Sequence, residues 1–186
     1  WDEQLVAEWL DVKRQARRQN RTVYVGLVFG IVVEQNFELA ANDPKRKYKG
    51  RAVFQGNNVK DQDSNWAIFQ ALGSSPATMD VARACDAFGL FPGNAIEQSD
   101  AEQAYTQAWL TGTETWVRLP RDQWPQKWID DDMQDPVCPL HLALYGHPDS
   151  GTDWEKHSHA HLVSVGFTPM DGWPSCFGHE EHELFF

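Results

Sequence analysis

The sequence predicts an α+β fold in which helices pack on a mixed or antiparallel sheet, and three observations carry this prediction. Residues 22–34 and 47–56 are rich in Val and other strand-forming residues, which is typical of two neighbouring β-strands. Apolar residues recur at helical spacing over residues 76–88 and again over residues 152–163. Apolar residues make up 41% of the 186 positions, which is enough for one sizeable core or for two small lobes that share a cleft.

The N-terminal part of the chain predicts a helix followed by a β-hairpin. Asp2 is a suitable N-cap for a helix with Leu5 and Trp9 on its apolar face, and cations follow in its last turns. Those cations suit the negative end of the helix dipole, and phosphate contact is the alternative. In the first strand, Gly26 and Gly30 indicate a bulge or a close approach to the backbone. The expected hairpin has a basic tip with Lys45, Arg46, Lys47, Lys49 and Arg51.

The clearest helix signal has Ser75 as its N-cap and Pro76 at the first helical position, and it ends at Gly89. A strand over residues 95–101 is expected next, with Asp100 near its end. The remaining predictions are short strands at 115–119, 176–177 and 184–186, a helix at 152–163, and an irregular acidic stretch at 124–139.

The net charge of −11 is unevenly distributed along the chain. Residues 1–60 carry 11 Lys and Arg against 7 Asp and Glu, whereas residues 61–186 carry 5 against 20. A basic part followed by an acidic part suits a polymerase cleft, because one contacts phosphates while the other collects metal ions. An acidic surface that keeps a domain soluble is the plainer alternative.

Cysteine usage and hydropathy indicate the cellular compartment in which we expect the protein. Cys85, Cys138 and Cys176 are odd in number and far apart, which argues against a disulfide framework and for a reducing compartment. The best apolar run, residues 23–33, is too short to span a bilayer, and the acidic start is not a secretory signal. We therefore expect an intracellular protein, cytoplasmic or nuclear, with no membrane partner. A first residue other than Met indicates a piece of a longer protein.

Asp100 and Tyr105 are the leading candidates for chemistry. A template-directed polymerase needs a carboxylate for the divalent metals that bridge the incoming phosphates, and a flat ring beneath the sugar can exclude a 2′-hydroxyl. Lys49 and Arg51 alternate along a predicted strand, so they share one face and can clamp a triphosphate. The alternatives are a surface carboxylate, a packed aromatic ring and an edge strand protected by its charge.

The histidines, which are clustered late in the chain, favour a different hypothesis. His157 and His161 are spaced one helical turn apart, and Cys176-x-x-His179 has the spacing of metal ligands. No complete Cys/His signature is present, so a small zinc-binding protein is a weaker hypothesis than a polymerase-related one.

Four segments, in order along the chain, resemble blocks of the reverse transcriptase domain of copia-type long-terminal-repeat retrotransposons. Residues 48–56, Tyr-Lys-Gly-Arg-Ala-Val-Phe-Gln-Gly, resemble the Tyr-Lys-Ala-Arg-Leu-Val-Ala-x-Gly block of the family's fingers. Residues 99–105, Ser-Asp-Ala-Glu-Gln-Ala-Tyr, resemble its first catalytic block, Met-Asp-Val-Lys-Thr-Ala-Phe. Residues 115–120 are similar to Ile-Tyr-Met-x-Leu-Pro, and residues 142–149 fall where the family has a Leu-Tyr-Gly-Leu-Lys-Gln turn.

The resemblance implies a partial right-hand polymerase fold, made of fingers and an incomplete palm. Residues 1–44 would form the N-terminal helix and the first fingers strand, and residues 45–186 the fingers and palm fragment. The implied activity is RNA- and DNA-directed DNA synthesis with Mg²⁺ or Mn²⁺ as cofactor. The implied partners are an RNA or DNA primer–template, a dNTP, and the remainder of a polyprotein that carries the thumb and ribonuclease H.

The resemblance also assigns roles by matching position. Asp100 would be the catalytic aspartate that binds metal, and Tyr105 would be the sugar-discriminating aromatic residue, where the family usually has Phe. Arg51 and Lys49 would contact the triphosphate, to which the backbone amides of Gln103 and Ala104 would also donate. The complete nucleotide-binding set is Lys49, Arg51, Gln103, Ala104, Tyr105 and Asp149.

Two departures from the family's pattern limit the implied activity. Asp149 stands where the family has Gln, and a carboxylate there repels phosphate. The second catalytic block, Tyr-x-Asp-Asp, is absent and would follow the strand that begins at Leu184. We therefore expect a reverse transcriptase fragment that does not polymerise on its own. The alternative is a non-enzymatic remnant of the domain that binds nucleic acid or a protein.

Overall fold

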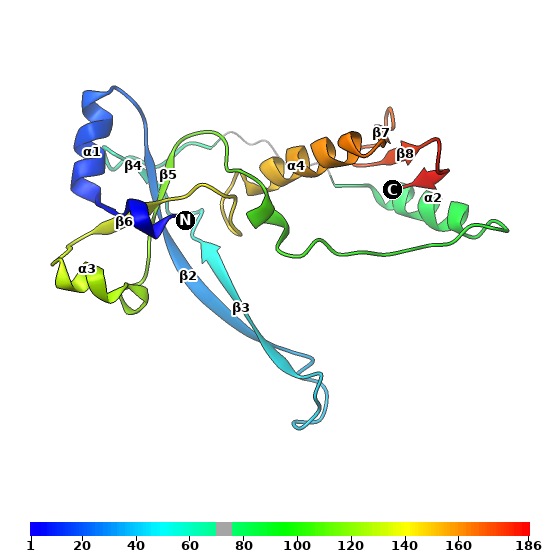
Figure 1. The fold of residues 1–186 in the computed structure, drawn as a ribbon, viewed down its shortest axis with the longest axis horizontal. Coiled ribbons are helices and arrows are strands. Elements are labelled where there is room, and N and C mark those ends of the chain that lie inside the picture. Colours follow the sequence, from blue (N-terminus) through cyan, green and yellow to red (C-terminus); the bar gives the residue numbers. More distant parts are fainter. Residues whose placement is uncertain (70–75) are drawn as a thin grey trace.

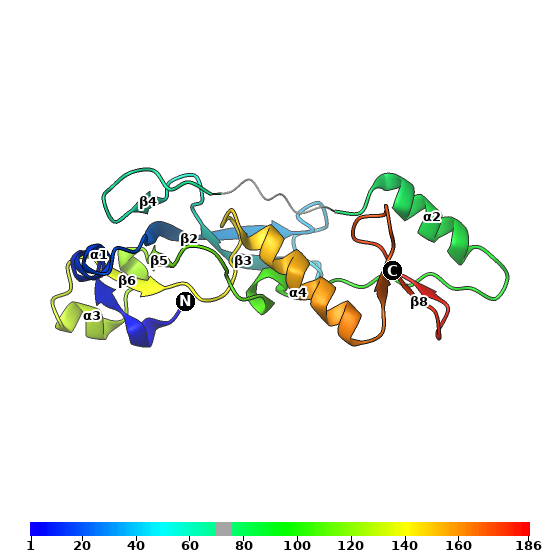
Figure 2. The same ribbon diagram turned by 90° about the horizontal axis from the view of Figure 1, so that it is seen from above.

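The computed structural model describes residues 1–69 and 76–186, and it has a mixed α+β fold. Its elements form two lobes joined end to end, with a long hairpin projecting from the first lobe (Figures 1 and 2). The first lobe comprises residues 1–69 and 108–149, and the second lobe comprises residues 76–107 and 150–186. Within the described residues, no helix combines the length and apolar character that a membrane span requires.

The first lobe is built on a six-stranded mixed sheet with the spatial order β1-β6-β5-β2-β3, to which β4 adds by pairing with β2. Its strands are β1 (Ala7–Glu8), β2 (Tyr24–Gln35), β3 (Lys47–Phe54), β4 (Lys60–Asp61), β5 (Thr115–Arg118) and β6 (Pro136–Pro139). The β2–β5 pair is parallel and the other pairs are antiparallel. The sheet therefore confirms the predicted α+β class, with a mixed strand arrangement.

The projecting hairpin consists of β2 and β3 and confirms the two strands predicted for this region. Their register runs without interruption from the pair Val28↔Phe54 to the pair Gln35↔Lys47. A close approach to the backbone exists at Gly26, where a Cβ atom would overlap the ring of Phe54. At Gly30, in contrast, no atom of the described residues lies within 4 Å of a Cβ position.

The helix α1 (Trp9–Arg18) packs against one end of the main sheet. Trp9, Val12 and Ala16 lie on one helix face and are buried together with Val23 and Val137. This helix does not begin after Asp2 as predicted. The carboxylate of Asp2 instead caps a 3₁₀ turn, η1 (Glu3–Leu5), because the following residues extend into β1 and pair with β6.

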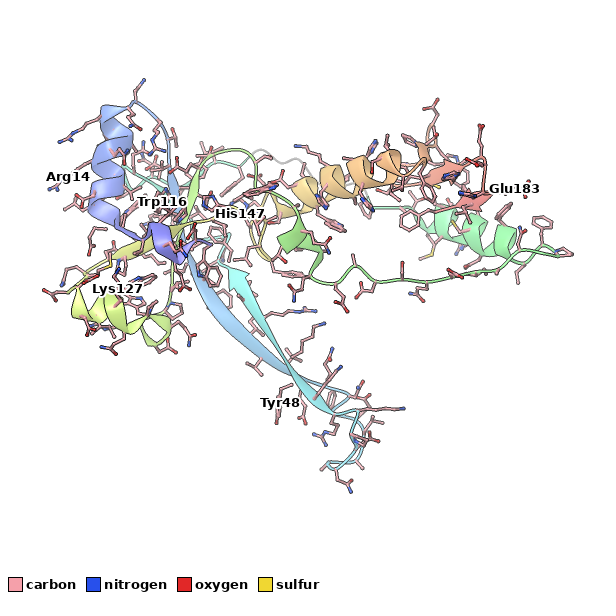
Figure 3. The ribbon with its side chains drawn as sticks, in the orientation of Figure 1. Arg14, Tyr48, Trp116, Lys127, His147 and Glu183 are labelled. Carbon is pink, nitrogen blue, oxygen red and sulfur yellow. The ribbon has the colours of Figure 1, made fainter. Side chains whose placement is uncertain are left out.

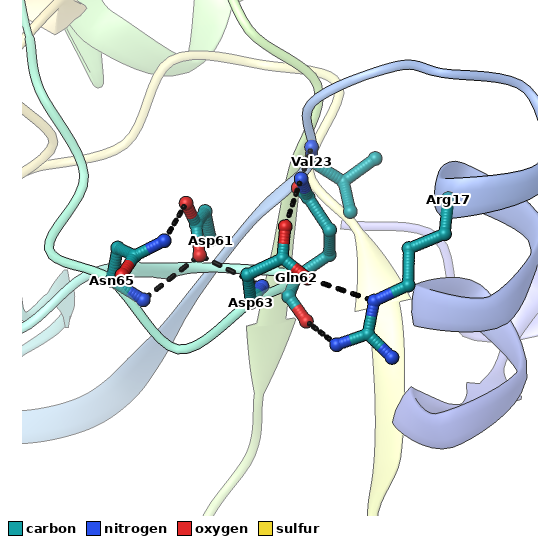
Figure 4. Close-up of polar contacts among 6 residues, drawn as sticks. All are labelled: Arg17, Val23, Asp61, Gln62, Asp63 and Asn65. Atoms are coloured by element: carbon teal, nitrogen blue, oxygen red, sulfur yellow. Dashed lines mark hydrogen bonds and ion pairs between the residues drawn. The ribbon is translucent and has the colours of Figure 1, made fainter.

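Several cations at and just after the end of α1 form hydrogen bonds or ion pairs within the protein. Arg17 donates to the Asp63 carboxylate over 2.8 Å and to the Gln62 carbonyl over 2.9 Å, and the Gln62 side chain accepts from the backbone of Val23 (Figure 4). Partial burial acts to raise the pKa of Asp61, but hydrogen bonds from Asn65 and Asp63 outweigh it and the pKa is lowered. Two further cations of this group form ion pairs, Arg14 with Asp11 and Arg21 with Glu114.

The stretch 124–139 is more ordered than its acidic, Pro-containing sequence predicted. It contains a short helix, α3 (Gln126–Asp130), preceded by the turn η3 (Arg121–Gln123), and it ends in β6. Trp128 is buried in the core beside Trp124, with ring centroids 6.3 Å apart. Packing of the buried Trp128 ring against the half-buried Trp124 ring orders a segment whose polar residues gave no periodic signal.

The second lobe has two helices and a small antiparallel sheet of order β7-β8-β9. Its elements are α2 (Met79–Gly89), η2 (Ala104–Gln107), α4 (Ser150–Ser164), β7 (Thr168–Pro169), β8 (Phe177–His179) and β9 (Leu184–Phe185). Strands β8 and β9 confirm the two short strands predicted at 176–177 and 184–186, and they pair antiparallel. Helix α2 begins three residues later than predicted, because Thr78 accepts the hydrogen bond from the backbone of Val81 and acts as the cap. Ser75, the predicted cap, lies outside the described residues.

Residues 95–101 are not a strand, contrary to the prediction. They run as an exposed extended segment between α2 and η2, and none of them is paired with a strand. The polar run Glu97-Gln98-Ser99-Asp100 offers no apolar face to bury, so no sheet is favoured there. Asp100 consequently stands on a connecting segment and not at a strand end.

Candidate functional site

A cavity of about 830 Å³ lies between β3, the segment 100–106 and the start of α4. Six of the seven residues predicted as site residues line it, although they come from segments up to 56 positions apart in the sequence. These six are Lys49, Arg51, Asp100, Gln103, Ala104 and Tyr105. The seventh, Asp149, is not among its lining residues.

Strand β3 supplies the cationic wall of this cavity. Lys49 and Arg51 pair across the hairpin with Val33 and Ile31, two residues apart on each strand, so both cations share one face of the sheet. Both side chains belong to an exposed part of the ribbon. Arg46, by contrast, forms an ion pair with Glu34 at the hairpin tip, and it stabilises the hairpin.

Two tyrosines form the aromatic floor of the cavity. The ring centroids of Tyr105 and Tyr145 are 4.7 Å apart in an edge-to-face arrangement of 69°. The guanidinium of Arg51 lies over the Tyr145 ring, 5.5 Å from its centroid. The two rings therefore link the cationic wall of β3 to the segment that carries Asp100.

Glycine at position 146 allows Tyr145 to lie against β3. The backbone of Phe54 donates to the Tyr145 carbonyl over 2.7 Å, and a Cβ atom on Gly146 would overlap the Phe54 carbonyl oxygen. Gly146 also has a φ of +88°, a backbone angle that residues with a side chain rarely adopt. The turn thus holds Tyr145 beside the end of the hairpin.

The segment before η2 is shaped by its own side chains. Gln103 adopts a left-handed backbone conformation with a φ of 52°. Its carbonyl accepts from the Thr106 hydroxyl over 2.9 Å, and the Gln107 amide donates to the Glu102 carbonyl over 2.7 Å. These contacts close a tight turn that aims Tyr105 into the cavity.

Asp100 and Glu102 are the carboxylates that line the cavity, and both are exposed. Across residues 1–69 and 76–186, no group of three His, Cys, Asp or Glu side chains is placed to hold a metal ion. Mg²⁺ commonly takes one or two carboxylates together with substrate phosphates. The donor set therefore fits a divalent ion that arrives with a triphosphate, and not one held by protein ligands alone.

Asp149 lies beside a separate, smaller cavity of about 240 Å³ that Asp153 also lines. Burial, and then the nearby Asp153 carboxylate, raise the pKa of Asp149 above its ordinary value. Asp153 itself is 3% exposed and accepts from the Thr111 backbone over 2.8 Å and from the Thr111 hydroxyl over 2.5 Å. This arrangement ties α4 to the loop before β5.

His147 is a buried titratable residue that the sequence analysis did not single out. It is 4% exposed, lies at the junction of the two lobes (Figure 3), and packs between the rings of Phe54 and Phe69. Its Nδ1 accepts from the backbone of Asp149 over 3.2 Å. Burial lowers the pKa of His147 to about 4, so the imidazole is neutral at physiological pH.

Four of the late histidines make ring contacts. His157 stacks on Trp154, with centroids 5.7 Å apart, and His159 lies edge-on to Phe177 at 5.3 Å. His179 stacks on His182 at 4.5 Å. These packing contacts give each of these rings a structural role.

Sequence reasoning missed the carboxylate of Glu102 as a site residue, and it also missed two aromatic residues of the cavity, Tyr145 and Trp154. The two aromatic residues line the cavity together with Tyr105. For the aromatic residues, the available signal was a ring directly before the turn at Gly146 and another at the start of the following helix. Neither signal identifies a cavity until the turn is folded against β3.

Comparison with protein-family models, curated protein sequences and solved structures finds no match for this chain. We therefore infer its function from its own residues and their arrangement.

Proposed function

We propose that the cavity between β3 and η2 binds a deoxynucleoside triphosphate, and that the chain is part of a copia-type reverse transcriptase. The observation that supports this proposal is the convergence of Lys49, Arg51, Asp100 and Tyr105 on one cavity. The four residues lie in two separate segments of the sequence, and both segments resemble blocks of that family. In this proposal the β2–β3 hairpin corresponds to the fingers, and the second lobe to part of the palm.

The charges of the cavity suit a triphosphate that carries a divalent cation. Lys49 and Arg51 present ammonium and guanidinium donors to phosphate oxygens on one side. Asp100 and Glu102 face the same space with carboxylates, which would hold the cation of the complex. The cation, when bound, neutralises phosphate charge. The chain's own residues bind and orient the nucleotide.

The aromatic floor favours a nucleoside over inorganic polyphosphate. A sugar or base placed on Tyr105 contacts a flat ring whose position is fixed by its edge-to-face neighbour Tyr145. A ring beneath the sugar disfavours a 2′-hydroxyl, so a deoxynucleotide is expected to bind more tightly than the ribonucleotide.

A non-enzymatic, nucleic-acid-binding role is the second candidate, and the carboxylate content of the cavity favours it. Phosphoryl transfer by two metal ions needs carboxylates that hold both ions across the attacking and leaving oxygens. Asp100 and Glu102 are exposed and lie on a connecting segment, which is a poor scaffold for that geometry. We expect the 186-residue chain to bind nucleotide without extending a primer.

The test of nucleotide binding is a fluorescence titration with a labelled dATP in the presence of Mg²⁺. We expect Arg51→Ala and Lys49→Ala each to weaken binding by about tenfold, in line with loss of a charged hydrogen bond. Arg14→Ala is the matched control, because Arg14 lies on α1, away from the hairpin (Figure 3). Equal losses in all three variants would indicate general charge attraction and would contradict the proposed site.

A separate assay distinguishes the two candidates. Primer extension on an RNA template with Mg²⁺ or Mn²⁺ detects polymerase chemistry directly. Salt-dependent binding of the same primer–template without extension supports the binding role. Primer extension that disappears in Asp100→Asn would overturn the expectation that this chain is inactive.

A further inference from the structure

Two tryptophans from distant parts of the sequence line one surface cavity of about 450 Å³ in the first lobe. Trp1 is 39% exposed and Trp109 is 69% exposed, although both rings are large and mostly apolar. Single exposed apolar residues are common on protein surfaces, whereas rings that gather around one cavity are typical of a binding site. The two indoles thus indicate a ligand that prefers aromatic surfaces.

Backbone pairing holds Trp109 in the wall of this cavity. Trp109 forms an antiparallel bridge with Leu142, and the backbone of Leu110 donates to the His141 carbonyl over 2.8 Å. The ring of His141 also lines the cavity, with its centroid 6.4 Å from the Trp109 ring and its plane tilted by 60°. Two π-systems are therefore held at an angle to each other, and Leu142 adds apolar surface beside them.

Hydrogen bonds position Trp1 as another part of the wall. The backbone of Asp2 donates to the Pro139 carbonyl at the end of β6 over 3.1 Å, which ties this end of the chain to the sheet (Figure 1). The indole N–H of Trp1 donates to the Glu3 carboxylate over 3.1 Å. Because that N–H lies in the plane of the ring, the bond positions the indole and leaves its π-faces for other contacts.

The charge of the cavity suits a cation. Asp2 and Glu3 line it with carboxylates, and none of its described lining residues is Lys or Arg. The faces of aromatic rings carry negative potential, which attracts a cation within about 6 Å of the ring centre. A bare metal ion needs a larger set of protein ligands, and no group of three His, Cys, Asp or Glu side chains in residues 1–69 and 76–186 supplies one. An organic cation with an apolar surface gains from the rings and the carboxylates together.

We propose that this cavity binds a quaternary ammonium ligand of the trimethylammonium class. The methyl groups pack on the indoles of Trp1 and Trp109, and the charge they surround faces the rings. Asp2 and Glu3 add electrostatic attraction. This inference does not rest on the proposed nucleotide function, because the two cavities share no described lining residue.

The atoms that carry the trimethylammonium group decide which ligands fit. Choline and a trimethylated lysine side chain present the cation next to neutral atoms. Phosphocholine, the headgroup form, carries a phosphate a few bonds away from the cation. The carboxylates of Asp2 and Glu3 repel that phosphate, so the cavity favours choline and trimethylated lysine over the headgroup.

The experiment is an NMR titration of the 186-residue protein, in which the α-amine of Trp1 is acetylated so that it adds no positive charge beside the carboxylates. The indole N–H signals of Trp1 and Trp109, assigned by replacing each residue with Phe, report binding. The probes are choline, phosphocholine and 3,3-dimethylbutanol, the uncharged carbon isostere of choline, all added at constant ionic strength.

We expect choline to shift both indole signals saturably. Choline should bind at least about tenfold more tightly than its carbon isostere, because only the cation is attracted to the ring faces and the carboxylates. Phosphocholine should bind more weakly than choline. Equal binding of choline and the isostere, the lack of a saturable shift with choline, or tighter binding of phosphocholine would each overturn the proposal.

Variants separate this cavity from general binding of choline to exposed indoles. Trp109→Ala should weaken choline binding by about tenfold or more and keep the circular dichroism spectrum, because the ring is exposed. Trp66→Ala is the matched control, because Trp66 is 63% exposed, lies beside Lys60 and does not line the cavity. It should bind choline as the wild type does.

Glu3→Gln keeps an oxygen that accepts from the Trp1 indole and removes the negative charge. This variant should bind choline about twofold to fivefold more weakly at low salt. Equal losses in Trp109→Ala and Trp66→Ala, or choline binding that Trp109→Ala leaves unchanged, would overturn the proposed site.

Discussion

The guanidinium of Arg51 lies over the ring of Tyr145, 5.5 Å from its centroid, and this contact joins the projecting hairpin to the turn before α4. Tyr145 in turn meets Tyr105 edge to face. The three residues come from three separate segments, so their contact defines the cavity more than any single motif does. Substitutions at the contact and in the packing that supports it should therefore have distinct, measurable effects.

Tyr145 should matter for nucleotide binding through its ring and not through its hydroxyl. Tyr145→Leu removes both the cation–π contact with Arg51 and the edge-to-face contact with Tyr105, so we expect about tenfold weaker binding of labelled dATP. Tyr145→Phe keeps both ring contacts and should bind within about twofold of the wild type. A Phe variant as weak as the Leu variant would assign the effect to the hydroxyl.

Gly26 should be intolerant of a side chain. Its Cβ position overlaps the Phe54 ring, so Gly26→Ala should lower the free energy of unfolding by about 1–3 kcal/mol through overpacking. Gly30→Ala is the matched control on the same strand, because no atom of the described residues lies within 4 Å of its Cβ position. This substitution should change the free energy of unfolding by about 0.5 kcal/mol or less. Urea unfolding midpoints at constant m-value measure both effects. Similar midpoints for the two variants would contradict this packing.

His147 should make the protein less stable in mild acid. The folded-state pKa of about 4 lies below the ordinary 6.5, so the unfolded chain binds the proton more readily between these values. The loss in the free energy of unfolding is negligible well above pH 6.5. It grows as the pH falls and reaches roughly 3 kcal/mol near pH 4. His147→Leu should flatten this part of the stability curve. Curves for variant and wild type that stay parallel from about pH 7 to about pH 4 would show that His147 is not buried as a neutral ring.

Thr111 should stabilise the buried carboxylate of Asp153. Thr111→Val removes the hydroxyl donor but keeps the backbone donor, so we expect a loss of about 1–3 kcal/mol in the free energy of unfolding. Thr168→Val, in the exposed strand β7, is the matched control and should change it little. Thermal and urea unfolding report both variants. Equal stability of the Thr111 variant and the wild type would indicate that water replaces the hydroxyl.

Much of the fold could be predicted because its signals are local. The β2–β3 hairpin, β5, α4 and the β8–β9 pair each follow from apolar patterning within a few residues. The two-residue strands β1 and β7 could not be predicted, because their pairing partners come from other segments. Residues 95–101 were wrongly expected as a strand because an extended preference alone does not supply a neighbouring strand.

Most of the cavity's charged residues could be predicted from the sequence, Glu102 excepted, whereas its aromatic residues other than Tyr105 could not. The resemblance to polymerase blocks named Lys49, Arg51, Asp100 and Tyr105, and the structure gathers these four around one cavity. The same resemblance placed Asp149 in the nucleotide site, whereas its carboxylate lies near Asp153 beside another cavity. The role of Tyr145 depends on the close approach of its turn to β3, which no local pattern encodes.

The most direct test of the central claim is photo-crosslinking with 8-azido-dATP and Mg²⁺, followed by peptide mapping of the labelled sites. If the cavity between β3 and η2 holds the nucleotide, the label should fall on Tyr105, Tyr145 or their immediate neighbours, and unlabelled dATP should compete for it. The Arg51→Ala variant should lose most of that labelling while keeping its fold by circular dichroism. Competed labelling confined to α1 or to the β7–β9 sheet, unaffected by Arg51→Ala, would contradict the account.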